Sequence, residues 1–104
     1  MKIFAILDVK ANHFLQPFTD SSTVSALRGF DAAVNEGKSV FSRFPDDFCL
    51  CELAHFEQAT GEIIPHKSPL NLGSARTVLR QPEFQHSLPG MKALNSDATS
   101  GRVN

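Results

Sequence analysis

The spacing of apolar residues predicts strands at the start of the chain. Residues 2–8 (KIFAILD) are apolar on both faces, which is typical of a strand in the centre of a sheet. Residues 13–18 (HFLQPF) predict a returning strand after a polar turn. Pro17 places that strand at a sheet edge, because proline cannot donate a hydrogen bond to a neighbouring strand.

The next segment has the period of an amphipathic helix. The polar residues 19–22 contain side chains that cap helix N-termini, and Gly37 is suited to a left-handed helix end. Between them, apolar residues recur at spacings of three, three and four, which places them on one helix face. These apolar positions are Val24, Leu27, Phe30 and Val34.

Residues 44–64 (FPDDFCLCELAHFEQATGEII) predict a β-hairpin. From Phe48 the apolar residues alternate with period two, and residues 58–61 (QATG) fit a tight turn with Gly61 at positive φ. Residues 62–65 form the predicted return strand, which Pro65 ends or leaves at an edge. In the preceding connection, residues 40–44 predict a further helical turn that packs onto the core.

After Pro65 we expect a loop over residues 66–72 and a short helix ending near Gln81, beyond which periodicity is lost. The chain is therefore predicted to form one α+β domain over residues 1–81. Its small antiparallel sheet has four strands, in the order β-β-α-β-β, packed by one amphipathic helix. A disordered, flexible C-terminal tail is predicted over residues 82–104. One sheet face would stay uncovered, and a partner could cover it.

The charge distribution identifies a weak candidate for nucleic-acid binding. The net charge of −1 gives no general attraction to nucleic acid or membranes. Residues 1–67 carry six Lys and Arg against nine Asp and Glu, whereas residues 68–104 carry four against two. Phosphate contact needs clustered cations, and the candidates are Lys67, Arg76, Arg80 and Lys92. The alternative is an ordinary solvated basic face.

Catalytic and metal chemistry is not predicted. Cys49, Cys51 and His55 share a face of the predicted strand, but C-x-C spacing with one nearby histidine does not match a zinc site. No spacing couples a histidine to a cysteine, and no phosphate-binding glycine loop is present. We therefore expect no enzyme activity, no cofactor and no metal, with both thiols filling space in the sheet.

The first residues lack a basic segment followed by a sustained apolar run, so no signal peptide is expected. No apolar stretch approaches about 20 residues, so no membrane-spanning helix is expected either. These features favour a reducing, cytosolic compartment with free thiols.

Four segments within roughly residues 1–80 resemble the small nonstructural protein of gokushovirus-type microviruses, which are single-stranded DNA phages. The segments are MKIFAILDVKANHFLQPF, AAVNEG, FPDDFCLCELAHFEQATGEI and PLNLGSA. The chain departs from the family pattern at Cys49 and Cys51, where an aromatic-rich strand is usual. The resemblance implies a DNA-binding protein of the host cytoplasm that is absent from the mature virion, with no catalytic residues attributed to it.

Two functions follow from these observations. In the first, a non-enzymatic phage accessory protein acts in viral single-stranded DNA synthesis or packaging by binding DNA or the replication complex. In the second, a self-associating interaction module acts on the replication initiator or a capsid protein without touching DNA. A homodimer would then form through the edge strands around Pro17 and Pro65.

Overall fold

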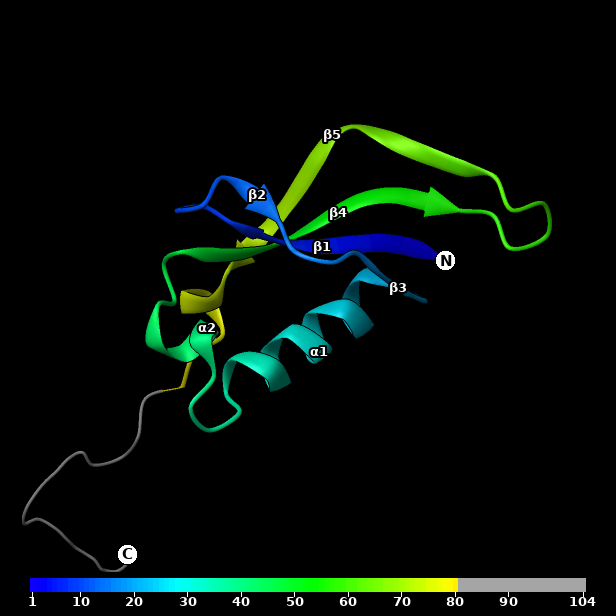
Figure 1. Ribbon diagram of the computed structural model, residues 1–104. Coiled ribbons are helices and arrows are strands. Elements are labelled where there is room, and N and C mark those ends of the chain that lie inside the picture. Colours follow the sequence, from blue (N-terminus) through cyan, green and yellow to red (C-terminus); the bar gives the residue numbers. More distant parts are fainter. Residues whose placement is uncertain (81–104) are drawn as a thin grey trace, which may run out of the picture.

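The computed structural model describes residues 1–80, which form one antiparallel sheet with helices along one face (Figure 1). Within these residues no helix is long and apolar enough to cross a membrane. In chain order the elements are β1 (Lys2–Asp8), β2 (His13–Phe14), β3 (Phe18–Asp20), α1 (Thr23–Val34), α2 (Val40–Arg43), β4 (Phe48–Phe56), β5 (Ile63–Ser74) and the 3₁₀ turn η1 (Ala75–Thr77). The predicted α+β class is confirmed.

The sheet has five strands, so the predicted number of four is wrong. Its order is β2-β1-β4-β5, and β3 pairs with the other half of β1. Residues 13–18 do not form one strand: β2 pairs with Leu7 and Asp8, whereas β3 pairs with residues 2–4. Pro17 lies between the two short strands, where its missing N–H interrupts the ladder.

Helix α1 begins and ends as its sequence predicts. The Ser22 hydroxyl accepts a hydrogen bond from the Ser25 N–H at 3.1 Å, and Gly37 has the positive φ expected after the helix. Phe30 and Val34 are buried against the sheet. The sequence predicts Val24 on this buried face, but Val24 is 61% exposed, because the helix packs on the sheet through Ala26, Phe30 and Val34.

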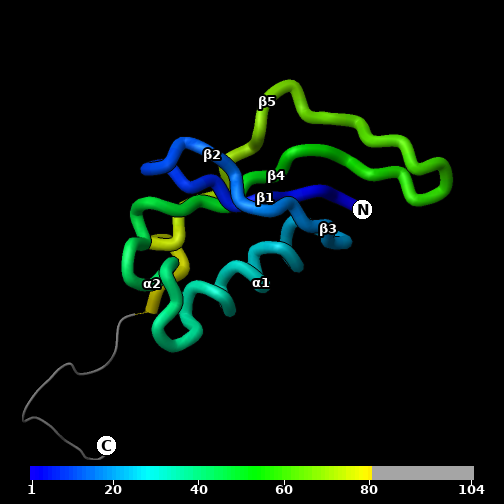
Figure 2. Tube along the Cα trace, viewed as in Figure 1, coloured from blue at the N-terminus to red at the C-terminus, as the bar shows by residue number. Residues whose placement is uncertain are grey.

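One apolar core fills the space between the sheet and the helices. Phe4 of β1 and Leu50 of β4 are fully buried and project toward α1. Phe41 of α2 joins them, with its ring edge-to-face on Phe48 at 5.0 Å between centroids. The backbone trace shows α1, α2 and η1 on the same side of the sheet, with the β4–β5 hairpin extending past α1 (Figure 2). The opposite sheet face has no helix over it within residues 1–80.

Strand β5 does not end at Pro65 as predicted but continues to Ser74. Pro65 pairs with Ala54 and Leu70 with Glu52, so residues 66–69 all lie opposite one β4 residue, Leu53. The predicted loop over residues 66–72 is therefore wrong: residues 66–69 form a wide bulge, after which the strand resumes. An edge strand tolerates this bulge and its prolines, because no neighbouring strand on its outer side needs hydrogen bonds from its backbone.

The predicted helix over residues 72–81 is also wrong. Residues up to Ser74 belong to β5, and only the three-residue turn η1 follows. Leu72 faces the core from the end of the strand, and Val78 and Leu79 face it from the turn and the residues after it. The apolar spacing that predicts a helix therefore comes from a strand end followed by a turn. The predicted flexible tail over residues 82–104 lies outside the described residues.

Glu52 is the only buried charged residue within residues 1–80, at 5% exposure. Its carboxylate accepts a hydrogen bond from the Thr23 hydroxyl at 2.8 Å and lies 2.7 Å from His66 Nε2. Lys2 Nζ lies 3.5 Å from the same carboxylate and donates to the Thr23 hydroxyl at 3.0 Å. These contacts connect β4 to β1, to the first turn of α1 and to the bulge in β5.

Burial raises the pKa of Glu52, but hydrogen bonds from Thr23 and His66 and the charge of Lys2 outweigh burial and leave this pKa below its usual value. The folded state therefore holds the ionised carboxylate more strongly than the unfolded chain does. This stabilisation is fully present above pH 4.5, the ordinary pKa, and is lost as pH falls through the folded-state pKa.

We expect Glu52→Gln to lower the free energy of unfolding by about 1–3 kcal/mol at neutral pH, because charge-assisted hydrogen bonds are lost. The difference from the unmodified protein should shrink as the pH falls below 4.5 and through the folded-state pKa, because the glutamate then becomes protonated. Urea denaturation followed by circular dichroism at several pH values measures both effects. Glu62→Gln, an exposed change on the same hairpin, is the control and should match the unmodified protein at every pH.

Candidate nucleic-acid interface

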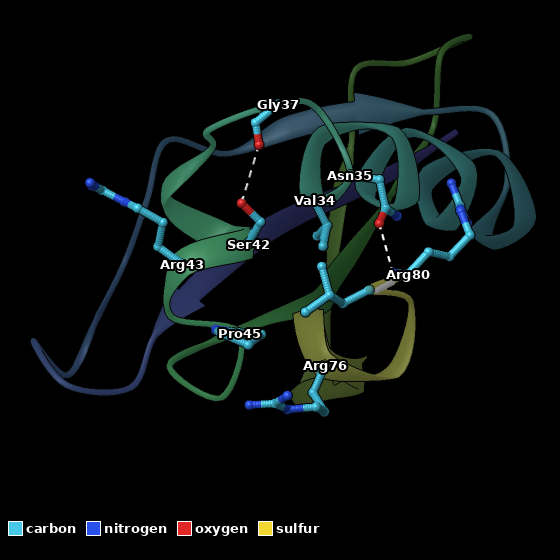
Figure 3. Close-up of a pocket in the computed structure, with 9 residues that line it drawn as sticks. Val34, Asn35, Gly37, Ser42, Arg43, Pro45, Arg76 and Arg80 are labelled. Atoms are coloured by element: carbon cyan, nitrogen blue, oxygen red, sulfur yellow. Dashed lines mark hydrogen bonds between the residues drawn. The ribbon is translucent and has the colours of Figure 1, made fainter. Parts of the chain in front are cut away.

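A pocket of about 510 Å³ opens where the end of α1, the helix α2 and the turn η1 meet (Figure 3). Its lining includes three arginines that come from different parts of the chain. The lining residues are Val34, Asn35, Gly37, Ser42, Arg43, Pro45, Arg76, Leu79 and Arg80.

Asn35 holds the wall of this pocket together. Its side-chain N–H groups donate to the Val78 carbonyl and the Asp31 carbonyl, each at 2.9 Å. Its side-chain oxygen accepts a hydrogen bond from the Arg80 backbone N–H at 2.8 Å. The residue that ends α1 therefore fixes the segment after η1, and this contact sets the position of Arg80.

Arg76 is oriented by a two-point contact with Asp46. Its Nε and a terminal nitrogen donate to the two carboxylate oxygens at 3.0 and 2.9 Å. The Arg76 backbone N–H also donates to the Pro45 carbonyl at 3.1 Å, which joins η1 to the loop before β4. The arginine hydrogen bonds lower the pKa of Asp46, so the pair stays ionised at neutral pH.

Arg80 is paired with Asp31 of α1 at 2.9 Å. The Arg80 side chain is 67% exposed and the Asp31 side chain 35%. Hydrogen bonding from Arg80 lowers the pKa of Asp31. Both arginine–aspartate pairs are accessible to water, and exposed pairs of this kind are weak enough for another anion to compete.

Arg43 and Phe44 lie beside the same pocket. The Arg43 guanidinium carbon is 5.6 Å from the centroid of the Phe44 ring, and this ring is 50% exposed. Within residues 1–80 no carboxylate oxygen lies within 4 Å of the Arg43 side-chain nitrogens. The expectation that Phe44 packs onto the core is wrong, because α2 ends at Arg43 and the ring turns outward.

The structure brings together two of the four predicted cation sites. Arg76 and Arg80 both line the pocket, although η1 and the residues after it, not one helix face, place them there. Lys67 lies apart from them in the β5 bulge, next to His66 in sequence. Lys92 lies outside the described residues.

Sequence reasoning missed Arg43 and Phe44. They are more than 30 residues before Arg76, in the connection between helix and hairpin, where the sequence predicts that Phe44 packs onto the core. The sequence signal for them is that they are adjacent, because an arginine next to an aromatic residue can contact a phosphate while the ring stacks on a base.

Cys49 and Cys51 are buried free thiols in β4. Burial, with the neighbouring Cys49 as a further cause, raises the pKa of Cys51 to about 11, which keeps it protonated and unreactive at neutral pH. The bulge at Leu53 turns His55 to the helix side, paired with Lys2, so His55 does not share their face. Within residues 1–80 no group of three or more His, Cys, Asp or Glu is arranged to hold a metal.

A family model described as "Phage ORF5 protein" matches residues 1–78, three-quarters of the chain. The chain belongs to the phage ORF5 protein family. No curated protein and no solved structure matches it.

The phage ORF5 assignment agrees with the phage origin implied by the sequence resemblance. The matched region contains Arg43, Phe44 and Arg76 and ends two residues before Arg80. Most of the pocket therefore belongs to the part of the chain that defines the family.

We expect Asn35→Ala to destabilise the protein by about 1–3 kcal/mol, because it leaves the Val78 carbonyl and the Arg80 N–H without their side-chain partner. Thermal and urea unfolding measure the loss. Glu36→Ala, at the exposed neighbouring position, is the matched control and should change stability far less. Equal losses in the two variants would contradict the structural role given to Asn35.

Proposed function

We propose that this phage ORF5 protein is a non-enzymatic accessory protein that binds single-stranded DNA through Arg43, Phe44, Arg76 and Arg80 during viral DNA synthesis or packaging. The observation that carries the proposal is that three exposed arginines line one pocket, and that the exposed Phe44 ring lies beside one of them, Arg43. The resemblance to gokushovirus nonstructural proteins supports the same assignment.

The guanidinium groups supply phosphate contacts. An arginine presents planar donors that match phosphate oxygens, and three arginines exceed the two aspartates that pair with them. A DNA phosphate could replace the exposed carboxylates of Asp31 and Asp46 with little loss to the protein. Arg43 adds a cation that needs no such exchange within the described residues.

The Phe44 ring supplies a surface for a base. Single-stranded binding proteins combine a basic groove with aromatic rings on which unstacked bases lie. Bases in a duplex are already stacked on their neighbours, so an exposed ring favours single strands. The ring is half exposed and lies beside Arg43, so the proposed base and phosphate contacts would be one residue apart.

The proposed role uses no catalytic group and no cofactor, because the reactive side chains have structural positions. Cys49 and Cys51 are buried in the sheet, and Glu52 is held by its hydrogen bonds. We propose the viral replication initiator and capsid protein as candidate protein partners, and the host cytoplasm, outside the mature virion, as the site of action.

We expect alanine variants of Arg43, Arg76 and Arg80 each to weaken binding to an oligonucleotide about threefold to tenfold, because each removes one phosphate contact. Fluorescence anisotropy at low salt measures the change. With three phosphates neutralised, the logarithm of the binding constant should fall against the logarithm of salt with a slope of about −2. Phe44→Ala should weaken single-stranded binding and leave any duplex binding unchanged.

Lys67→Ala is the matched control for these variants, since Lys67 is an exposed cation in the β5 bulge. It should leave binding nearly unchanged. A loss with Lys67→Ala as large as with Arg43→Ala would move the interface away from the pocket. No binding by the unmodified protein at low salt would exclude direct DNA contact.

We expect Asp46→Asn to strengthen DNA binding by about twofold to fivefold, because it removes the carboxylate that competes with phosphate for Arg76. The same anisotropy titration measures the gain, which should disappear in the double variant with Arg76→Ala. Asp47→Asn, a change of equal charge at the next residue, shows the general effect of losing one negative charge. If both aspartate variants gain equally, Arg76 is not a DNA contact.

A further inference from the structure

The sheet face opposite the helices, here called the open face, is identified by the strand register. Residues paired across antiparallel strands project to the same side, so Ile3, Ala5 and Leu7 share a face with their partners. Phe4 and Leu50 project the other way, into the core with α1. The open face consists of Ile3, Ala5, Leu7, Phe14, Thr19, Cys49, Cys51, Ala54, Phe56, Ile63, Pro65, Asn71 and Ser74.

The open face has no charged residue among these thirteen, and ten of them are apolar. An antiparallel sheet with one face in water normally carries polar side chains on that face. Here Phe14 is 40% and Ile63 57% exposed, one at each end of the face. Exposed apolar side chains on an uncovered sheet face mark a candidate site of protein contact.

A second sheet could approach the middle of the open face closely. The central strands present small side chains at its middle: Ala5 on β1, and Cys49, Cys51 and Ala54 on β4. These four residues are at most 5% exposed, so the surface that a partner would cover comes mainly from the residues around them. Two sheets that pack face to face lie about 10 Å apart, and small central residues allow that approach.

We propose that the open face binds the open face of a second copy of this chain, giving a homodimer in which two sheets pack against each other. A two-fold axis brings each residue type near its own kind, so a charged face would repel itself. The open face carries no charged residue, so two copies of it would not repel each other electrostatically. Because the open face has no charged residue, it offers no ion pairs to nucleic acid or to a charged peptide.

This arrangement differs from the edge pairing that the sequence suggested. Pro65 and Pro69 in β5, and Pro17 between β2 and β3, remove N–H donors that an added strand would need. Packing of faces needs no free backbone groups. It also leaves the arginine pocket accessible, because α1, α2 and η1 lie on the other side of the sheet.

The size of the open face sets the expected affinity between the two copies in the dimer. A standard protein interface uses about 20–30 residues from each partner, and the open face provides thirteen. We therefore expect a reversible monomer–dimer equilibrium in the micromolar range. Sedimentation equilibrium of the full chain from about 1 µM to 500 µM measures it, and a monomer over this whole range would overturn the proposal.

The decisive variant replaces Phe14 and Ile63 with lysine. Both side chains are exposed in one copy, so the fold should persist, while like charges would meet in the dimer. We expect the dissociation constant of the dimer to rise at least about tenfold. The matched control replaces Val24 and Leu70 with lysine. Val24 lies on α1, and Leu70 pairs with Glu52, on the helix side of the sheet.

The control should dimerise like the unmodified protein. Equal weakening in both double variants, or an unchanged dimer in the Phe14 and Ile63 variant, would contradict the assignment to the open face. Circular dichroism melting checks that each variant is folded. If the lysine variant melts early, Phe14→Thr with Ile63→Thr repeats the comparison with residues that favour strands. DNA titration is a separate readout, so failure of the dimer and failure of the proposed DNA site are distinguishable.

Discussion

The buried carboxylate of Glu52 is the contact on which the arrangement of the other elements depends. A carboxylate at this depth is costly unless its oxygens are paired, and Thr23, His66 and Lys2 pair them from three different elements. The same group therefore sets the start of α1 over the sheet and closes the wide bulge of β5 onto the helix side. Apolar packing brings these elements together, and the directional bonds of Glu52 select one register among those that packing would allow.

The register has consequences at both surfaces of the protein. On the helix side, α1 ends where Asn35 can bond to residues 78 and 80, which gathers three arginines around one pocket. On the other side, the β4 bulge at Leu53 separates His55 from the two cysteines and leaves a face without charge. The cations and the apolar surface are thus kept apart. DNA binding and dimer formation, as proposed, would not compete for the same residues.

The exposed arginine–aspartate pairs have two opposite effects on anion binding at the pocket. Asp31 and Asp46 orient Arg80 and Arg76 when the pocket is empty, and they also oppose a bound anion. Such pairs preorganise the arginine side chains at the cost of some affinity. The Arg43 guanidinium lies over the Phe44 ring instead, and among the described residues no carboxylate competes for its charge. For a chain of net charge −1, the proposed affinity for DNA would be modest and sensitive to salt.

Local sequence patterns were enough to predict β1, α1, the 48–56 strand and its turn, because short-range periodicity, capping residues and Gly61 specify these elements without reference to distant parts. They also brought Arg76 and Arg80 forward as candidates. The extension of β5 through two prolines, the division of residues 13–18 and the short η1 depended on which strand lies at an edge. Likewise, Arg43 and Phe44 join Arg76 and Arg80 only because α2 and η1 pack against the end of α1. Contacts between residues 30 or more positions apart leave no periodic signal, so only the folded chain brings them together.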